Sequence, residues 1–163
     1  MPIGFLSALA AYWWARPTAA SWLAGALVAL LGEGIRVWAS GHVEKGREVT
    51  RSGPYRFVRH PLYLGSAIMG VGFAVGAMTL ATAVVVALYL CVTLLAAIRT
   101  EEAVLEERFG GEYSAYRRGR AAPVSRAFSF NRAFVTNKES RAIVGLAAGM
   151  SPAFSVTACA FGA

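Results

Sequence analysis

Two neighbouring apolar runs limit most strongly what this chain can fold into. The first extends from Leu62 to Met78 and the second from Leu80 to Ile98, and neither contains a charged side chain. A helix of about 20 apolar residues is long enough to cross the hydrocarbon core of a bilayer. Because only the uncharged Thr79 separates the two runs, we expect a helical hairpin whose tip lies on the outer side of a membrane.

The composition also favours a membrane protein. Hydrophobic residues make up 56% of the sequence, charged residues make up 15%, and the mean hydropathy is +0.51, whereas about a quarter of a typical soluble domain is charged. Three further runs are candidate spans: Ile3 to Ala15, which is short, Thr18 to Ala39, and Ala142 to Phe161. We therefore predict an all-α polytopic membrane bundle of about five transmembrane helices, forming one integral membrane domain over residues 1–163.

Positive charge is confined to two loops. The net charge is +7, and of the sixteen Lys and Arg residues five lie in 41–60 and nine in 99–141. Basic residues in alternate loops are typical of the cytoplasmic side of a membrane protein. We therefore expect a multi-pass protein whose basic loops are cytoplasmic and contact anionic membrane lipids, and we expect no nucleic-acid partner.

One charged pair lies inside a predicted span. Glu33 and Arg36 are three residues apart, so they share a helix face near the inner end of the run from Thr18 to Ala39. The simpler interpretation is a pair whose charged ends reach the membrane interface. The alternative is a polar lining between helices.

The second basic loop begins as a continuation of the preceding helix. Residues from Arg99 to Phe109 keep helical spacing, and the glycines at 110 and 111 are expected to end the helix. A later basic stretch carries Phe128, Phe130 and Phe134, a pattern typical of a segment that lies on anionic lipid.

Several common kinds of site are poorly supported by the sequence. The chain contains no Asp, His42 and His60 are eighteen residues apart, and both cysteines sit inside apolar runs, so we expect no metal site. Neither standard Gly-rich phosphate-binding loop occurs. Ser52 lacks the strand-turn-helix elbow that surrounds the nucleophile of a serine hydrolase.

Two oppositely charged pairs stand where helices are expected to meet the cytoplasm. Arg59 and His60 precede the first apolar run, and Glu101 and Glu102 follow the second. Together they would suit a small zwitterionic ligand. The alternative is that the two pairs neutralise each other between adjacent helix ends.

Three motifs surround these pairs in a fixed order. Ser-Gly-x-Tyr-x-x-x-Arg-His-Pro-x-Tyr-x-Gly covers residues 52–65, Glu-Glu-x-x-Leu covers residues 101–105, and Phe-Gly-x-Glu-Tyr-x-x-Tyr covers residues 109–116. In this order, with two spans between the first two motifs, they resemble the isoprenylcysteine carboxyl methyltransferase family and the related phospholipid methyltransferases. The resemblance covers roughly residues 41–120, about half of the chain; the terminal segments on either side carry no motif of the family.

The resemblance implies a membrane methyltransferase that uses S-adenosyl-L-methionine, with a cytoplasmic cofactor-binding region. Its acceptor would be a lipophilic small molecule or a lipid-linked group in the membrane, for example a carboxylate as in isoprenylcysteine O-methylation. The implied cofactor-binding residues are Val49, Thr50, Gly53, Tyr55, His60, Pro61, Leu62, Tyr63 and Glu101, to which we add Arg59 as a partner for the carboxylate of the cofactor.

Four more residues near these motifs need a role. Arg99 is the nearest match to an arginine that the family turns toward its substrate. Glu102 is a candidate base for an amine or thiol acceptor, whereas a carboxylate acceptor would need none. We interpret Tyr113 and Tyr116 as packing or interface residues rather than as members of the site.

Two other functions remain open from the sequence. A family of NADPH-dependent membrane sterol or enone reductases resembles the same Arg-His-Pro-x-Tyr segment, although this chain is short for it and its Glu-Glu-x-x-Leu motif fits the methyltransferases better. The second alternative is a non-catalytic membrane adaptor that docks partners through its basic loops.

Overall fold

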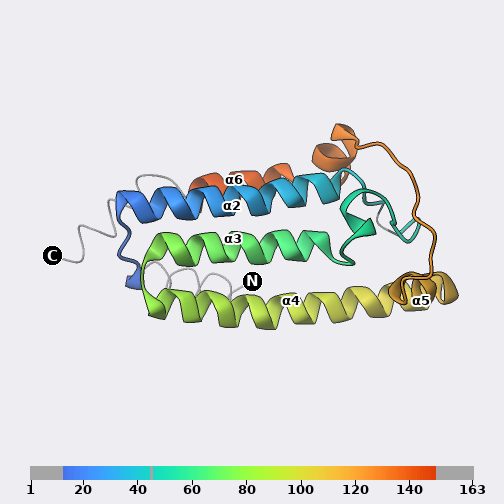
Figure 1. Cartoon of the computed structure of the whole chain (residues 1–163), viewed down its shortest axis with the longest axis horizontal. Helices are drawn as coiled ribbons and strands as arrows, with labels where there is room; N and C mark the ends of the chain where they lie inside the picture. Colours follow the sequence, from blue (N-terminus) through green and yellow to red (C-terminus); the bar gives the residue numbers. More distant parts are fainter. Residues whose placement is uncertain (1–12, 45, 150–163) are drawn as a thin grey trace.

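The longer helices of the described residues run lengthwise through the molecule (Figure 1). The computed structural model describes residues 13–44 and 46–149, and these helices are α2 (Ala19–Ser40), α3 (Pro61–Ala77), α4 (Leu80–Phe109) and α6 (Ser140–Gly149). Three short helical segments lie between them: η1 (Gly53–Arg56), α5 (Gly111–Arg117) and η2 (Arg132–Thr136). No strand occurs within the described ranges, so the predicted all-α fold is confirmed for them.

Two of the helices can cross a membrane. α2 and α4 are long and apolar enough, whereas α3 is a shorter apolar helix of 17 residues. Both long helices turn large apolar side chains outward, for example Leu31 and Val92, which are each 68% exposed. The expected count of about five spans is not confirmed, because residues 1–12 and 150–163, which hold most of the first run and of the last, lie outside the described part.

The predicted hairpin of α3 and α4 is confirmed. Met78 takes a left-handed conformation with φ of 58° at the turn, and the hydroxyl of Thr79 accepts a hydrogen bond from the backbone N–H of Thr82 to cap α4. α4 then continues without a break beyond its apolar part, residues 80–98, and ends at Phe109. Gly110, with φ of 45°, ends it as the sequence predicts.

The backbones of α2 and α3 are almost in contact. A Cβ atom added at Gly32 would lie 2.6 Å from the carbonyl oxygen of Gly65, and one at Gly72 would lie 2.6 Å from backbone atoms of Gly25 and Ala29. Small residues at such positions let two membrane helices approach closely. This glycine seam, formed by Gly25, Gly32, Gly65 and Gly72, fixes the position of the start of α3 relative to α2.

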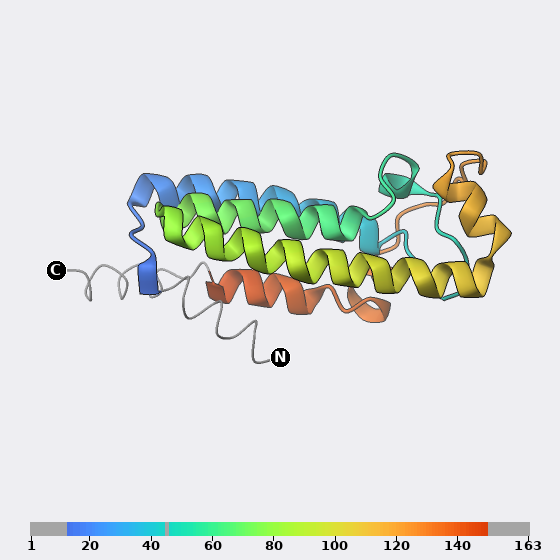
Figure 2. The ribbon, with the colours of Figure 1, turned by 90° about the horizontal axis from the view of Figure 1, so that it is seen from below.

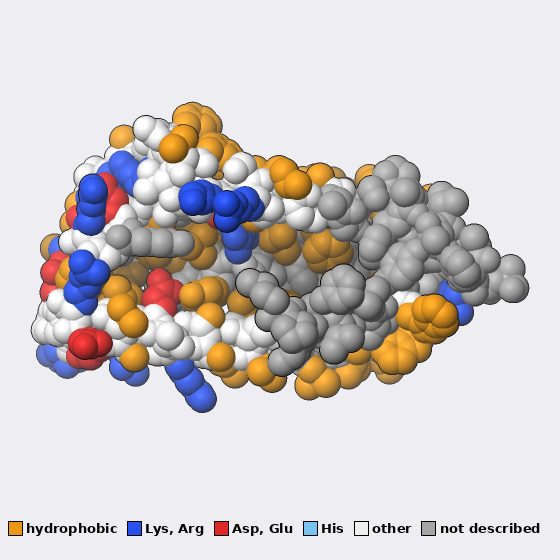
Figure 3. All heavy atoms as spheres, turned by 180° about the vertical axis from the view of Figure 1, so that it is seen from behind, with side chains coloured by type: hydrophobic (Ala, Val, Ile, Leu, Met, Phe, Trp, Pro, Cys, Tyr) orange, Lys and Arg blue, Asp and Glu red, His pale blue; other side chains and the backbone are white. Residues whose placement is uncertain are grey.

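Both basic loops lie at the same end of the bundle, which we call the loop end. Residues 41–60 and 110–137 gather there in both ribbon views, at the end opposite the turn between α3 and α4 (Figures 1 and 2). On the face drawn in Figure 3, charged side chains cluster over the loop end and hydrophobic side chains follow the helices. The shared end agrees with the predicted topology; its cytoplasmic orientation stays a prediction.

The interpretation of Glu33 and Arg36 as a pair at the membrane interface is wrong. Glu33 is only 5% exposed, and its Oε2 lies 3.5 Å from Nε of Arg36. Arg36 also donates a hydrogen bond to the hydroxyl of Ser66 on α3 and forms an ion pair with Glu139, the residue before α6. The pair therefore lines the space between three elements, α2, α3 and the segment before α6.

Candidate functional site

A short turn connects the first basic loop to α3. Gly53 opens it with φ of 55°, a conformation that glycine adopts without strain. Pro54 and Pro61 stand in the first turns of η1 and α3, where a fixed φ and a missing N–H are tolerated. The motif around these residues thus shapes the turn that places Tyr55 and His60 at the start of α3.

His60 is bound to a carboxylate of α4. Its Nε2 lies 3.1 Å from Oε1 of Glu102, and the same oxygen lies 3.5 Å from Nη1 of Arg59. Glu102 lies beyond the apolar part of α4, and the hydrogen bond from His60 outweighs the effect of burial and lowers its pKa below the usual range. The two charged pairs of the sequence therefore meet between adjacent helix ends, and Glu102 is ionised at neutral pH.

The carboxylate of Glu101 has weaker contacts within the protein than that of Glu102. Among the described residues its one ion pair is with His60, at 4.0 Å between Oε2 and Nδ1, which is beyond hydrogen-bond distance. The hydroxyl of Tyr63 lies beside the same carboxylate, and the Glu101 side chain is partly exposed. Its oxygens therefore remain available to a ligand that carries an ammonium or hydroxyl group.

Tyr55 and Tyr116 connect η1 to α5. The hydroxyl of Tyr116 donates a hydrogen bond of 2.8 Å to the carbonyl oxygen of Tyr55. Burial raises the pKa of Tyr55 far above its ordinary value, with a further contribution from the charge of Glu101, and burial raises the pKa of Tyr116 to about 12. Both hydroxyls stay neutral at physiological pH, so each can act as a hydrogen-bond donor.

Tyr113 lies closer to the site than the sequence suggested. It is 1% exposed, which agrees with a packing role, and its hydroxyl has no hydrogen-bond partner among the described residues. Burial and the nearby charge of Glu102 raise its pKa to about 12. Tyr113 and Tyr116 are three apart in the third sequence motif, a spacing that places both on one face of α5.

Val49, Thr50 and Arg99 form no hydrogen bond or ion pair with this group in the described structure. Val49 and Thr50 are buried within the first basic loop, where the Thr50 hydroxyl accepts a hydrogen bond of 3.3 Å from the backbone N–H of Glu44. Arg99 is exposed on α4. Pro61 and Leu62, by contrast, belong to the first turn of α3 directly after His60.

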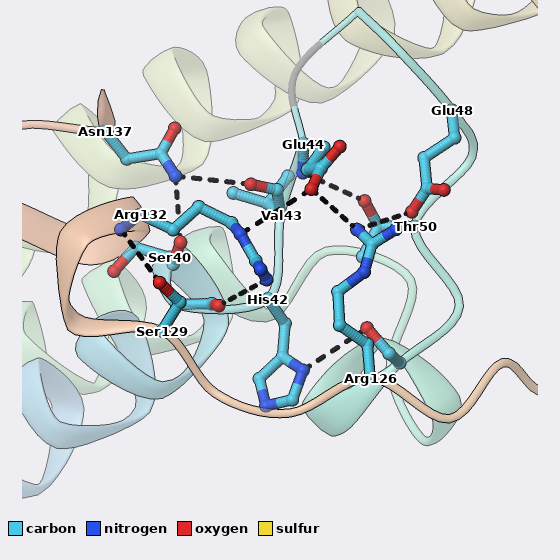
Figure 4. Close-up of polar contacts among 12 residues, drawn as sticks. Ser40, His42, Val43, Glu44, Glu48, Thr50, Arg126, Ser129, Arg132 and Asn137 are labelled. Atoms are coloured by element: carbon cyan, nitrogen blue, oxygen red, sulfur yellow. Dashed lines mark hydrogen bonds and ion pairs between the residues drawn. The ribbon is translucent and has the colours of Figure 1, made fainter.

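A segment between α5 and α6 holds the first basic loop in place, a contact that the sequence did not reveal (Figure 4). Asn137 donates hydrogen bonds through Nδ2 to the carbonyl oxygens of Ser40, at 2.8 Å, and Val43, at 3.3 Å. Arg132 donates one of 2.8 Å through Nη1 to the carbonyl oxygen of Gly41. These bonds satisfy backbone groups that the end of α2 leaves unpaired.

Ion pairs and a buried histidine extend the same contact. Nη1 of Arg126 lies 2.7 Å from Oε1 of Glu48 and 3.4 Å from Oε1 of Glu44. His42 is buried, with Nδ1 at 3.2 Å from the hydroxyl of Ser52, and its ring packs near that of Phe128. The part of this segment around Phe128 therefore packs against the first basic loop. Contact with lipid stays a prediction for the exposed residues of the segment.

The cluster at the start of α3 brings together chemically different groups. It offers a weakly engaged carboxylate at Glu101, an imidazole at His60 fixed by a second carboxylate, and neutral tyrosine hydroxyls. No group of three or more metal-binding side chains occurs within the described residues. The arrangement is suited to a small polar ligand that carries both positive charge and hydroxyl groups.

Comparison with known proteins identifies a family. The family model described as phospholipid methyltransferase matches residues 19–112, more than half of the chain. The matched region runs from the start of α2 to α5 and contains η1, His60 and both glutamates of the cluster. No curated protein and no solved structure matches the chain.

Proposed function

This chain is a membrane methyltransferase of the phospholipid methyltransferase family, which includes isoprenylcysteine carboxyl methyltransferase-like proteins, and we propose that it methylates a lipophilic acceptor with S-adenosyl-L-methionine. The proposal rests on one observation: His60 at the start of α3 lies next to the carboxylates of Glu101 and Glu102 on α4. The cluster lies at the loop end of apolar helices, where a polar cofactor and a membrane-bound acceptor can meet.

The polar groups of the cluster suit this cofactor. S-adenosylmethionine carries a sulfonium, an ammonium, a carboxylate and the hydroxyls of its ribose. Glu101 would bind the ammonium or the ribose. His60, Arg59 or backbone N–H groups at the start of α3 would bind the carboxylate. Tyr55 and Tyr63 would lie against the adenosine, as aromatic rings commonly do with planar ligands.

The protein contributes alignment and a dry environment. When bound, the cofactor supplies an electrophilic methyl group on its sulfonium. Glu102 fixes the orientation of His60, and the first basic loop, with Val49 and Thr50, would cover the site from the loop end. Correct alignment of two reactants can supply several kcal/mol, about 7–11 in favourable cases, of the barrier reduction.

The need for a base depends on the acceptor. A carboxylate, as in isoprenylcysteine O-methylation, is already a nucleophile at neutral pH. An amine or thiol must lose a proton, and the lowered pKa of Glu102 makes this carboxylate a weak base. When Arg59 or the backbone N–H groups hold the cofactor carboxylate, His60, oriented by Glu102, is the better proton acceptor. Arg99 would face the acceptor from α4.

The cofactor also determines the proposed topology. S-adenosylmethionine is made in the cytosol, so the loop end would face the cytoplasm. We propose one multi-pass domain over residues 1–163, with the first and last apolar runs completing a bundle of about five spans.

Titration of the detergent-solubilised protein with S-adenosylhomocysteine tests the proposal. Wild type should bind it saturably, and His60→Ala and Glu101→Gln should each weaken binding about tenfold or more, since each removes a charge-assisted contact. Glu106→Gln is the matched control, because Glu106 is exposed on the same helix and forms no ion pair in the described structure. Equal binding by all four proteins would refute the assignment of the site.

The same titration separates the alternatives. Binding of NADPH without binding of S-adenosylhomocysteine would favour a reductase. A folded protein that binds neither ligand would favour an adaptor. Once cofactor binding is established, product formation with lipophilic carboxylates, amines and thiols in mixed micelles identifies the class of acceptor.

A further inference from the structure

A cavity of about 430 Å³ opens at the loop end between η1 and α5. Four arginines contribute to its wall: Arg51, Arg56, Arg59 and Arg117. The other lining residues are Tyr55, Phe57, Val58, Tyr116, Gly119, Ala121 and Pro123. No acidic residue belongs to the wall formed by the described residues.

The positive charge of this arginine cavity is only partly neutralised. Nη2 of Arg51 lies 2.9 Å from Oε1 of Glu112, and Nη1 of Arg59 lies 3.5 Å from Oε1 of Glu102. Arg56 and Arg117 are exposed and form no ion pair with any described residue. The arginine cavity therefore has an excess of positive charge, which attracts anions.

This charge makes the arginine cavity unsuitable for the proposed cofactor. S-adenosylmethionine is a net cation at neutral pH, and four arginines would repel it. The carboxylates of Glu101 and Glu102, which suit a cation, do not belong to the wall. Tyr55 and Arg59 are shared, since both line the arginine cavity and both lie next to the His60 cluster, whereas Arg51, Arg56 and Arg117 line the arginine cavity and have no proposed contact with the cofactor.

The side chains next to the arginines are apolar and exposed. Phe57 is 79% exposed and Val58 is also exposed, and Arg56 and Arg59 flank them in the sequence. A surface that combines arginine with exposed aromatic and aliphatic groups is typical of contact with the headgroup layer of a membrane. The apolar helix α3 begins, and α4 ends, at this same end of the molecule (Figure 2).

We propose that the arginine cavity binds a phosphate group, as a site separate from the methyl-transfer site. A planar guanidinium can donate two parallel hydrogen bonds to phosphate oxygens, and a phosphate monoester offers enough oxygens for several arginines at once. The phosphate can belong to the headgroup of an anionic lipid or to a soluble phosphate ester. Arg51, Arg56 and Arg117, which have no proposed contact with S-adenosylmethionine, would supply most of the contacts to this phosphate.

Thermal unfolding of the full-length protein in detergent tests the proposal. The probes are short-chain phosphatidic acid, short-chain phosphatidylcholine of the same acyl length, and glycerol 3-phosphate. The variant Arg56→Gln/Arg117→Gln removes the two unpaired arginines. The matched control Arg118→Gln/Arg120→Gln removes the same charge from exposed neighbours that do not line the arginine cavity.

Short-chain phosphatidic acid should raise the unfolding temperature of wild type and of the control. The cavity variant should need about tenfold or more probe for the same shift, because two charge-assisted contacts are lost. An equal response to glycerol 3-phosphate identifies a soluble ester as the ligand, and a response to the lipid alone identifies a headgroup. No response in wild type, or equal loss in both double variants, would overturn the proposal. Binding of S-adenosylhomocysteine should be unchanged in both double variants. The test of phosphate binding can therefore fail while the proposed methyltransferase activity stands, and the reverse also holds.

Discussion

Nη2 of Arg36 on α2 lies 2.6 Å from Oε1 of Glu139, the residue before α6. Glu33 approaches the same guanidinium from one turn earlier on α2, at 3.5 Å. Both carboxylates are nearly inaccessible, and neither oxygen of Glu33 has a hydrogen-bond partner among the described residues. One guanidinium therefore compensates two buried carboxylates, and it connects α2, α3 and the start of α6.

Because one guanidinium faces two carboxylates, we expect very different losses of stability from two substitutions. Arg36→Met should cost about 3–5 kcal/mol of stability, because it leaves two buried carboxylates without a cation. Glu33→Gln should stay within about 1 kcal/mol of wild type, since it removes the surplus charge and keeps the pair of Arg36 and Glu139. Thermal unfolding in detergent measures both, and a larger loss from Glu33→Gln than from Arg36→Met would contradict the expectation.

The glycine seam predicts that adding a single methyl group has opposite effects at two glycines. Gly72→Ala should destabilise the protein by about 1–3 kcal/mol, because the new Cβ would lie 2.6 Å from the backbone of α2. Gly34→Ala is the control: nothing lies within 4 Å of its added Cβ, so higher helix propensity should stabilise the protein by about 0.5–1 kcal/mol. The measurement is the unfolding temperature of each variant compared with that of wild type, and an unchanged or higher value for Gly72→Ala would contradict the prediction.

His42 predicts a pH dependence of stability. Burial lowers its pKa below the ordinary 6.5, and the charges of Arg132 and Arg126 act in the same direction. The unfolded chain therefore binds the proton more readily, so the stabilising contribution is fully present above about pH 6.5 and is lost as the pH falls below it. His42→Gln should reduce the drop in unfolding temperature between about pH 7.5 and about pH 5.5; parallel curves for the two proteins would speak against this role.

Asn137 predicts a local effect on the first basic loop. Asn137→Ala removes two hydrogen bonds to carbonyl oxygens at the end of α2, at a cost of about 1–3 kcal/mol. Hydrogen exchange should become faster in residues 41–51, which the segment covers, while the centre of α4 should stay as protected as in wild type. Faster exchange throughout the chain would instead indicate global destabilisation.

Glu102 predicts a separation of turnover from cofactor binding. Glu102→Gln keeps the shape of the side chain but removes the charge that fixes His60. With an amine or thiol acceptor, kcat should fall about 10- to 100-fold while the affinity for S-adenosylhomocysteine changes much less. The measurement is methyl transfer together with titration of the product, with Glu106→Gln as control; equal losses of kcat and affinity would place Glu102 in the cofactor contacts instead.

The sequence predicts the helices better than their contacts. The apolar runs, Thr79 and Gly110 determine α3, α4 and their ends locally, through composition and backbone conformation, so the hairpin and the long α4 were predictable. The burial of Glu33 was not, because it depends on Glu139, more than a hundred residues later, and on the close approach of α2 and α3. Long-range partners of this kind leave no trace in local periodicity.

The candidate site shows the same division. The pairing of Arg59 and His60 with the glutamates of α4 was one of two alternatives that charge and the expected hairpin left open. The proximity of Tyr113 to Glu102 and the covering of residues 41–51 by the segment around Arg132 did not, since both depend on how α5 and η2 fold back over the loop end.

The unbroken length of α4 has a mechanical consequence. Glu101 stands three residues beyond Ile98, about 4.5 Å further along the same helix axis, with no joint between the lipid-facing part and the carboxylates. A change in the tilt of α4 would therefore move the carboxylates of Glu101 and Glu102 together, whereas His60 would move with α3. The distance between His60 and Glu102 thus depends on the relative inclination of two helices, and so on the thickness of the bilayer that surrounds them.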